Sequence, residues 1–153
     1  MLPSTTSRVA RNTDARVNQA IKLKTEANIA YFAQNPEEID RRLYELDDEW
    51  DIERTLEANA STLNIIGVTL AASGSRRWLM LPAAVSGFLL QHALQGWCPP
   101  IVFLRKRGIR TATEIAVERY ALKALRGDFG GLEDSTDLTT HERVRKVLAA
   151  LGK

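Results

Sequence analysis

The stretch that decides the fold of this chain is LEANASTLNIIGVTLAASGSRRWLMLPAAVSGFLLQHALQGWCPPIVFL, residues 56–104. Acidic and basic residues are absent from Ala58 to Ser75 and from Trp78 to Leu104, so that only Arg76 and Arg77 separate two apolar runs. A globular domain of this size would instead interleave charges along its amphipathic helices. This segregation predicts two apolar helices joined by a tight turn.

The two arms of this hairpin differ in apolar strength. The second arm, Trp78 to Gln95, is 18 residues long, which as a helix gives about 27 Å, close to the roughly 30 Å hydrocarbon core of a bilayer. The first arm, Leu56 to Gly74, is diluted by Asn59, Ser61, Thr62, Asn64, Thr69 and Ser73. Together the arms predict an all-α protein built on a two-helix transmembrane hairpin with helical cytoplasmic flanks.

The distribution of basic residues predicts an orientation for this hairpin. The turn carries Arg76 and Arg77, whereas the outer flanks carry Arg54 and the basic residues that follow Leu104. Positive flanks are retained in the cytoplasm. We therefore expect a multi-pass membrane protein with the lipid bilayer as a partner and both termini cytoplasmic.

The flanks of the hairpin read as helices. We expect an N-terminal tail and peripheral helix over 1–35, an acidic amphipathic helix over 36–55, the membrane hairpin with its GWCPP turn over 56–104, a basic helix over 105–130 and a short C-terminal helix over 131–153. Asn12 or Thr13 is the expected cap of the first helix. Ile39, Leu43, Leu46 and Trp50 share one face of the second, which is predicted to continue into the first apolar arm.

Helix-start signals recur after the hairpin. Thr111 and Glu114 form a capping-box pattern for a helix that Gly127 closes, and Thr139 and Glu142 form a second one. These spacings predict two separate helices beyond residue 110.

Two charge blocks of opposite sign flank the hairpin. Glu37 to Glu57 holds ten acidic and three basic residues, a net charge of −7, and Arg105 to Arg126 holds seven basic and two acidic residues, a net charge of +5. The blocks are expected either to face each other or to be separately solvated helix faces. The basic block lacks interleaved aromatic residues apart from Tyr120, so nucleic acid is not an expected partner.

Small and polar residues inside the hairpin are candidates for helix contact. Gly67 and Ala71 on one arm and Ala83 and Gly87 on the other would let backbones approach closely, although small residues are common in apolar helices generally. The polar side chains of Asn64, Gln91 and His92 are expected to bond between helices. A ligand or a proton path is the alternative interpretation.

Cys98 is the one residue that suggests covalent chemistry. It is the only cysteine of the sequence, which excludes an internal disulfide. A thiol near Arg105 and Lys106 is a candidate reactive group, and packing beside the turn at Pro99 and Pro100 is the alternative. His92 and Cys98 supply only two ligands, fewer than a metal site normally has, so no metal or cofactor is expected.

The segment Leu94-Gln95-Gly96-Trp97-Cys98-Pro99-Pro100 resembles the Gly-aromatic-Cys-Pro signature of the YgaP-like transmembrane domain, a bacterial inner-membrane family. The resemblance covers residues 56–104, and Glu118 to Phe129 is similar to an extended version of that domain. It implies membrane helices that self-associate. The best-known member carries a rhodanese, but this chain lacks the alternating strands and helices of a rhodanese and departs from the motif at Pro100. Sulfur transfer is therefore not implied.

These patterns predict a non-enzymatic, membrane-anchored scaffold or interaction module that self-associates, with a cytoplasmic protein as a further partner. Two alternatives remain open at this point. One is a thiol or persulfide relay through Cys98. The other is a soluble helical oligomer that buries the apolar segments at its subunit contacts.

Overall fold

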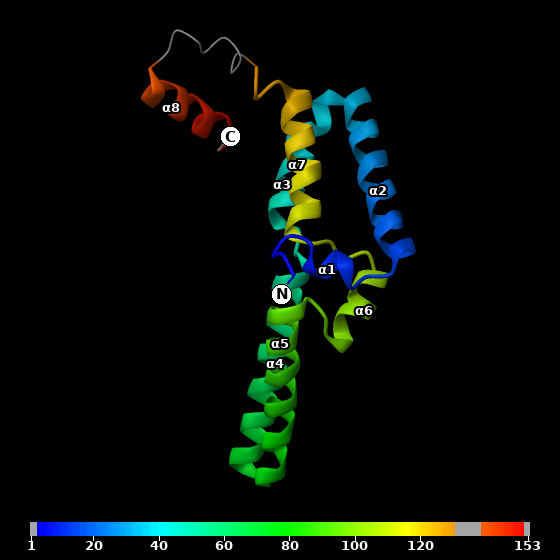
Figure 1. Cartoon of the computed structure of the whole chain (residues 1–153), viewed down its shortest axis with the longest axis vertical. Coiled ribbons are helices and arrows are strands. Elements are labelled where there is room, and N and C mark those ends of the chain that lie inside the picture. Colours follow the sequence, from blue (N-terminus) through cyan, green and yellow to red (C-terminus); the bar gives the residue numbers. More distant parts are fainter. Residues whose placement is uncertain (1–2, 131–138, 152–153) are drawn as a thin grey trace. The chain divides into compact units, whose positions relative to one another are not determined.

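The computed structural model describes residues 3–130 and 139–151, and all regular structure within these ranges is helical (Figure 1). The predicted all-α class is confirmed, but the chain forms more helices than a hairpin with simple flanks. In chain order the elements are α1 Arg8–Arg11, α2 Ala15–Gln34, the 3-10 turn η1 Pro36–Glu38, α3 Ile39–Asp48, α4 Ile52–Ser73, the 3-10 turn η2 Arg76–Leu79, α5 Met80–Gln95, α6 Pro99–Lys106, α7 Ala112–Arg126 and α8 Thr140–Leu151.

The chain divides into two compact units. The hairpin unit consists of residues 1–23 and 50–115, and the flanking unit consists of residues 24–49 and 116–153. Helices α2 and α7 both begin in the hairpin unit and end in the flanking unit, because a unit boundary falls within each of them.

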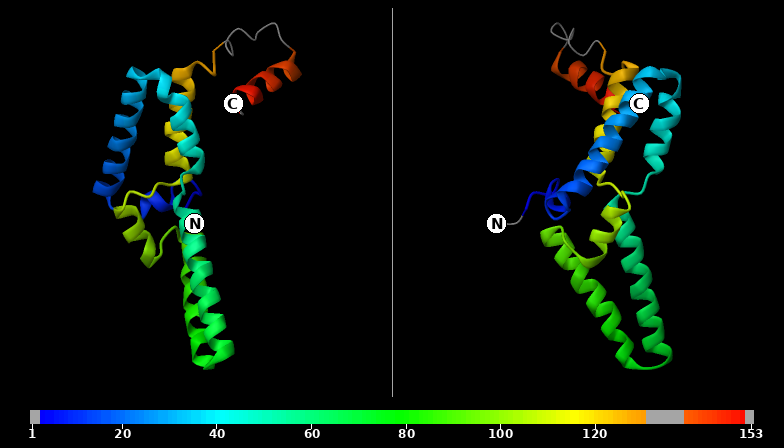
Figure 2. Two further views of the ribbon diagram at one scale, coloured as in Figure 1. Left: turned by 180° about the vertical axis from the view of Figure 1, so that it is seen from behind. Right: turned by 90° about the vertical axis from the view of Figure 1, so that its right-hand side faces the viewer.

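Helices α4 and α5 lie side by side and form the hairpin (Figures 1 and 2). Asp51 caps α4 by accepting a hydrogen bond from the backbone N–H of Arg54 at 2.8 Å. The two helices come closest at Gly67, where an added Cβ would lie 2.5 Å from Cδ of Pro82. A residue without a side chain is therefore required at this crossing.

The prediction that the hairpin crosses a membrane is wrong. Among the residues that the structure describes, none of the helices combines the length and the apolar character needed to cross a bilayer. Residues 76–79 form η2, so α5 has only 16 residues and spans about 24 Å. Helix α4 is longer, with 22 residues, but its apolar side chains are diluted by amides and hydroxyls. The predicted multi-pass inner-membrane localisation with cytoplasmic termini is overturned by the same finding.

The apolar core of the hairpin unit gathers where α4 begins. Ile52 and Leu56 from α4 pack with Val9, Cys98 and Ile101, all less than 5% exposed. Trp97, Leu104 and Ile109 cover this cluster from its edge. The backbone N–H of Ile52 also donates to the carbonyl of Arg110 at 2.8 Å.

The expected apolar face of residues 39–50 is present over α3, where Ile39, Leu43 and Leu46 are buried. The predicted continuous helix is wrong, because Glu49 is extended and Asp51 caps a new helix. Trp50 accordingly falls outside α3 and is 48% exposed, with the guanidinium of Arg54 stacked 4.4 Å from its ring centroid.

Ion pairs connect the acidic and basic blocks within the flanking unit, as one of the two interpretations expected. Arg119 lies 2.7 Å from Asp47, and Arg126 pairs with Asp40. In a third ion pair the acidic block supplies the cation and the basic block supplies the anion. The fully buried carboxylate of Glu118 accepts a hydrogen bond from Nε of Arg42 at 2.8 Å. Asn28 from α2 donates to the same carboxylate at 3.2 Å.

The capping predictions after the hairpin are confirmed. The N–H of Thr111 donates to Glu114 at 2.7 Å and the N–H of Glu114 donates to the Thr111 hydroxyl at 3.2 Å. Thr139 and Glu142 form the same reciprocal pair ahead of α8, which lies in the predicted C-terminal helix, and Gly127 follows α7 with a φ of +88°. The predicted cap of the first helix is wrong, because Asp14 rather than Asn12 or Thr13 accepts from the first turn of α2.

Candidate functional site

His92 is the most unusual side chain in the hairpin unit, because it is an ionisable group that is only 2% exposed. It lies in the last turn of α5, and its Nε2 is 2.8 Å from a carboxylate oxygen of Glu53 in the first turn of α4. The other carboxylate oxygen of Glu53 accepts from Arg8 at 2.8 Å. Glu53 thus connects both arms of the hairpin to the N-terminal segment.

The protonation of this cluster follows from its contacts. The Cys98 thiol and the Glu53 carboxylate raise the pKa of His92 to about 9, although burial opposes the charged form. His92 and Arg8 lower the pKa of Glu53, against the opposing effect of burial. At neutral pH the cluster therefore holds an imidazolium between a carboxylate and a thiol.

Cys98 follows His92 by six residues and lies beyond the end of α5, after a turn. Gly96 ends α5 with a φ of +76°, and Cys98, which is 3% exposed, then precedes α6 in extended conformation. Nδ1 of His92 is buried and makes no hydrogen bond of regular geometry. Nε of Arg8, in the same cluster, is likewise buried without a hydrogen bond of regular geometry.

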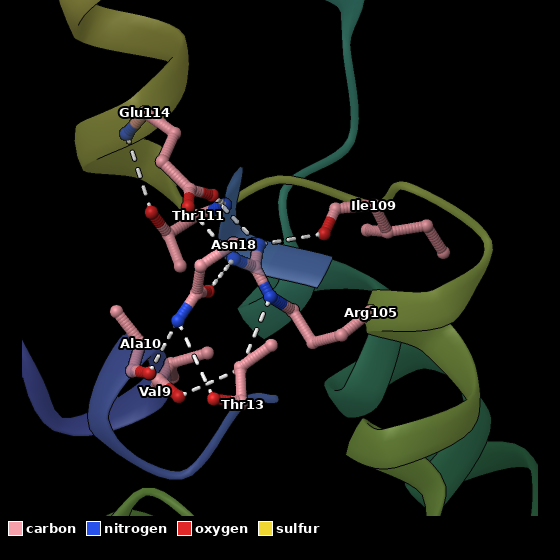
Figure 3. A network of polar contacts seen from close by, with 8 residues as sticks. All are labelled: Val9, Ala10, Thr13, Asn18, Arg105, Ile109, Thr111 and Glu114. Atoms are coloured by element: carbon pink, nitrogen blue, oxygen red, sulfur yellow. Dashed lines mark hydrogen bonds and ion pairs between the residues drawn. The ribbon is translucent and has the colours of Figure 1, made fainter. Parts of the chain in front are cut away.

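A second buried network surrounds Arg105, which is 1% exposed (Figure 3). Its guanidinium donates to both carboxylate oxygens of Glu114, at 2.6 and 2.7 Å, and to the side chain of Asn18 at 2.9 Å. It also donates to the carbonyl of Ile109 at 3.0 Å and to the Thr13 hydroxyl at 3.3 Å. The network joins α6 to α7 and to the start of α2.

This network corrects one expectation about Cys98. Arg105 was expected to favour a thiolate, but its five donors are directed at other groups and its charge is paired with Glu114. Burial raises the pKa of Glu114, yet the adjacent guanidinium and the backbone of Thr111 lower it further, so that the carboxyl titrates below its usual range. The cation beside Cys98 is His92 instead.

The hairpin exposes a large apolar surface. On α4, η2 and α5 the large apolar side chains that are at least 37% exposed are Leu63, Ile65, Ile66, Val68, Leu70, Trp78, Leu79, Met80, Phe88, Leu90 and Leu94. Ile65 and Val68, at i and i+3, share one face of α4, whereas Ile66 points about 100° away from Ile65. The apolar surface of α4 is therefore wider than one narrow stripe, and it shares the helix with exposed polar side chains such as Asn59 and Thr62.

The small and polar residues predicted to mediate helix contact are distributed unevenly. Gly67 is buried against Pro82 and Ala71 is half-buried, whereas Ala83 is exposed and an added Cβ at Gly87 would meet nothing within 4 Å. Asn64 lies 3.5 Å from the hydroxyl of Ser86. Gln91 is half-buried, and His92 bonds between the two helices to Glu53 of α4.

Stability should depend on pH through His92. Its pKa is raised from 6.5 to about 9, so the stabilisation is complete below pH 6.5 and is lost as pH rises through about 9. We expect the free energy of unfolding to fall by on the order of 2 kcal/mol between pH 7 and pH 10. Urea titrations at each pH measure this, with His92→Gln as the control. An equal decline in His92→Gln would contradict the assignment.

Sequence reasoning missed Glu53 and Arg8 as partners of His92, and it missed the structural role of Arg105. Glu53 precedes His92 by 39 positions and Arg8 precedes Glu53 by 45. The one available signal was an ionisable side chain within an apolar segment, which requires a polar partner when it is buried.

Metal-ligating residues do not gather in threes anywhere in residues 3–130 or 139–151. Comparison with known proteins gives no match: no family model, no curated protein and no solved structure corresponds to this chain. The resemblance of the Gly96–Pro100 motif to the YgaP-like domain therefore stays a sequence-based expectation.

Proposed function

We propose that this chain is a self-associating helical module, in which the hairpins of two copies pack together and cover each other's apolar surface. The observation that carries the proposal is the exposure of large apolar side chains around both α4 and α5. The proposal assigns the hairpin an assembly role and requires no catalysis.

The extent of the exposed surface supports an obligatory contact. Met80 is 74% exposed, Ile65 is 67% exposed and Leu90 is 61% exposed, and no charged residue lies between Ala58 and Ser75 to solvate α4. Large apolar side chains that gather on one face of a helix are normally buried against another element. Monomeric proteins rarely expose contiguous apolar patches beyond a few hundred Å².

The hairpin of a second copy of the chain has the same length and the same apolar area as the surface that it would cover. Two hairpins of α4 and α5 would form a four-helix bundle, the common way in which such helix pairs bury apolar faces. A stable two-fold interface buries about 800 Å² from each partner. The exposed apolar side chains along α4, η2 and α5 are numerous enough to supply an area of that order.

Charge at the two ends of the hairpin favours an antiparallel arrangement. Arg76 and Arg77 lie at the tip, so parallel packing would bring four guanidinium groups together. Antiparallel packing places each tip beside the start of the partner's α4, where Glu57 is exposed. The opposite charges then attract instead of repel.

Replacement of Ile65 by glutamate tests the proposal. We expect the wild-type chain to sediment as a dimer at micromolar concentration, and Ile65→Glu to weaken the association by at least about a hundredfold, since a carboxylate would be desolvated in an apolar contact. Sedimentation equilibrium measures both dissociation constants directly.

Val117→Glu is the matched control, because Val117 is 56% exposed and lies on α7, outside the hairpin. It should leave the dissociation constant unchanged. A wild-type chain that stays monomeric up to ~100 μM, an affinity too weak for a standard interface, would overturn the proposal. Equal weakening by both substitutions would do so as well.

A further inference from the structure

Helix α8 carries a row of apolar side chains that face solvent. Val144, Val147, Leu148 and Leu151 recur at i, i+3, i+4 and i+7, and each of them is at least 42% exposed. The buried residue of α8 is Ala150, which lies about 110° from the middle of this apolar stripe on the helix. The side of α8 that packs on the chain is therefore not its apolar side.

Both ends of α8 are held by specific hydrogen bonds. At its start, Thr139 and Glu142 form a reciprocal cap. At its end, Nζ of Lys123 donates to the carbonyl of Leu151 at 2.8 Å, and this lysine of α7 is only 6% exposed. A cation at the last carbonyls stabilises a helix. Because a helix of 12 residues is marginal by itself, these bonds keep α8 formed before any partner binds.

Basic side chains flank the apolar stripe on both sides. On the helix, Arg143 lies about 90° from the middle of the stripe in one direction and Arg145 lies about 110° from it in the other, and both are exposed. Helix α8 has three basic residues and one acidic residue, a net charge of +2. The acidic residue, Glu142, accepts from the Thr139 hydroxyl at the helix start, at 2.6 Å. The environment beside the stripe is therefore cationic.

We propose that α8 is a docking helix for the surface of an anionic lipid bilayer, where the apolar stripe enters the headgroup region and Arg143 and Arg145 contact lipid phosphates on its two sides. Arginine stems lie along apolar surface while their guanidinium groups remain in the polar layer. Such a helix lies in the plane of the surface, so no helix has to cross the bilayer. The contact does not use the hairpin and is independent of self-association.

The charge pattern fits a lipid surface better than a groove in another protein. Cations on both sides of a stripe require anions on both sides of the site that receives it. An anionic bilayer supplies phosphate groups all around the inserted side chains. A protein groove would need acidic residues along both of its rims at matched positions. The lipid surface is therefore the occupant that the flanking arginines favour.

Flotation of the full-length chain with lipid vesicles tests this proposal. The anionic vesicles contain phosphatidylcholine and phosphatidylglycerol in equal parts, and vesicles of phosphatidylcholine alone are the neutral reference. We expect at least about tenfold weaker partition onto the neutral vesicles, since each basic residue near an anionic surface contributes about a fivefold factor. Joint replacement of Arg143 and Arg145 by alanine should weaken partition onto the anionic vesicles by about tenfold or more for the same reason.

Two glutamate substitutions separate the apolar stripe from the charge. Leu148 is 61% exposed, so Leu148→Glu should leave the fold intact and weaken partition onto anionic vesicles by at least about a hundredfold. Ala149→Glu is the matched control, because Ala149 is the next residue, is exposed and lies about 150° from the middle of the stripe. It should weaken partition by only about fivefold. Circular dichroism without vesicles checks that both variants are folded.

Several outcomes would overturn the proposal. Equal losses for Leu148→Glu and Ala149→Glu would show that binding follows total charge and not the stripe. Partition that Leu148→Glu leaves unchanged would belong to another surface, such as the hairpin. Equal partition onto neutral vesicles would exclude a role for the arginines, and no partition onto anionic vesicles would favour a protein groove as the occupant. Sedimentation without lipid tests self-association separately, so either proposal can fail alone.

Discussion

Replacement of Arg105 by alanine is expected to lower the free energy of unfolding by about 3 to 5 kcal/mol, the typical cost of removing one partner from a buried ion pair. Arg105 is 1% exposed, and its loss leaves Glu114 without its bidentate partner. Asn18 and Thr13 lose a hydrogen-bond partner at the same time. Urea denaturation followed by circular dichroism measures the change.

Lys106→Ala provides the matched control for this prediction, because Lys106 is the next residue of α6 and is exposed. Its substitution should change stability by no more than about 0.5 kcal/mol. A loss of similar size in both variants would show that the effect arises from α6 in general. It would then not belong to the buried network.

Replacement of Gly96 by alanine is expected to lower stability by about 3 kcal/mol or more, through two separate effects. The backbone has a φ of +76°, which residues with a side chain rarely adopt. An added Cβ would also lie 2.5 Å from the carbonyl carbon of Arg8 and 2.6 Å from its oxygen. The N-terminal segment would have to move away from the end of α5.

Gly108→Ala separates the two effects, because Gly108 has a φ of +83° but nothing within 4 Å of an added Cβ. We expect this variant to lose only about 1 to 2 kcal/mol, the conformational part alone. The difference in the free energy of unfolding between the two variants, measured by urea denaturation, then gives the cost of the contact between the added Cβ and Arg8. Equal losses would contradict the close approach.

Local signals in the sequence predicted local structure well. The reciprocal hydrogen bonds of Thr111 with Glu114 depend on residues three positions apart, and such pairs can be read directly from spacing. The same holds for the buried face of Ile39, Leu43 and Leu46, because helical periodicity places these residues together. The errors concerned helix ends, where one aspartate at position 51 divides a predicted continuous helix.

The membrane prediction failed because it counted Trp78 and Leu79 in the second helix and gave the absence of charge more weight than apolar content. Charge-free segments are necessary for a spanning helix, but length and apolar content are required too. Trp78 and Leu79 belong to the 3-10 turn η2, which shortens the second helix to Met80–Gln95. The polar residues of α4 lower the apolar content of the first arm below what a membrane-spanning helix requires.

The cluster around His92 was predicted only in part. Cys98 and His92 were both identified as polar groups within an apolar stretch, but their spacing of six residues does not place them on one helix face. Their approach depends on the left-handed turn at Gly96, and the orientation of the ring depends on Glu53. The turn follows from a local glycine, whereas Glu53 lies 39 positions from His92 and is brought close only by the packing of α4 and α5.

The sequence by itself determined the all-helical class, the helix caps after the hairpin and the pairing of two apolar segments, because these depend on interactions between residues close in the chain. Tertiary structure alone decided which buried polar groups meet. Arg105 forms a hydrogen bond with Asn18, 87 positions away, and His92 forms one with Glu53, 39 positions away. A buried charge requires a partner, but only the packing of the helices determines which partner is within reach.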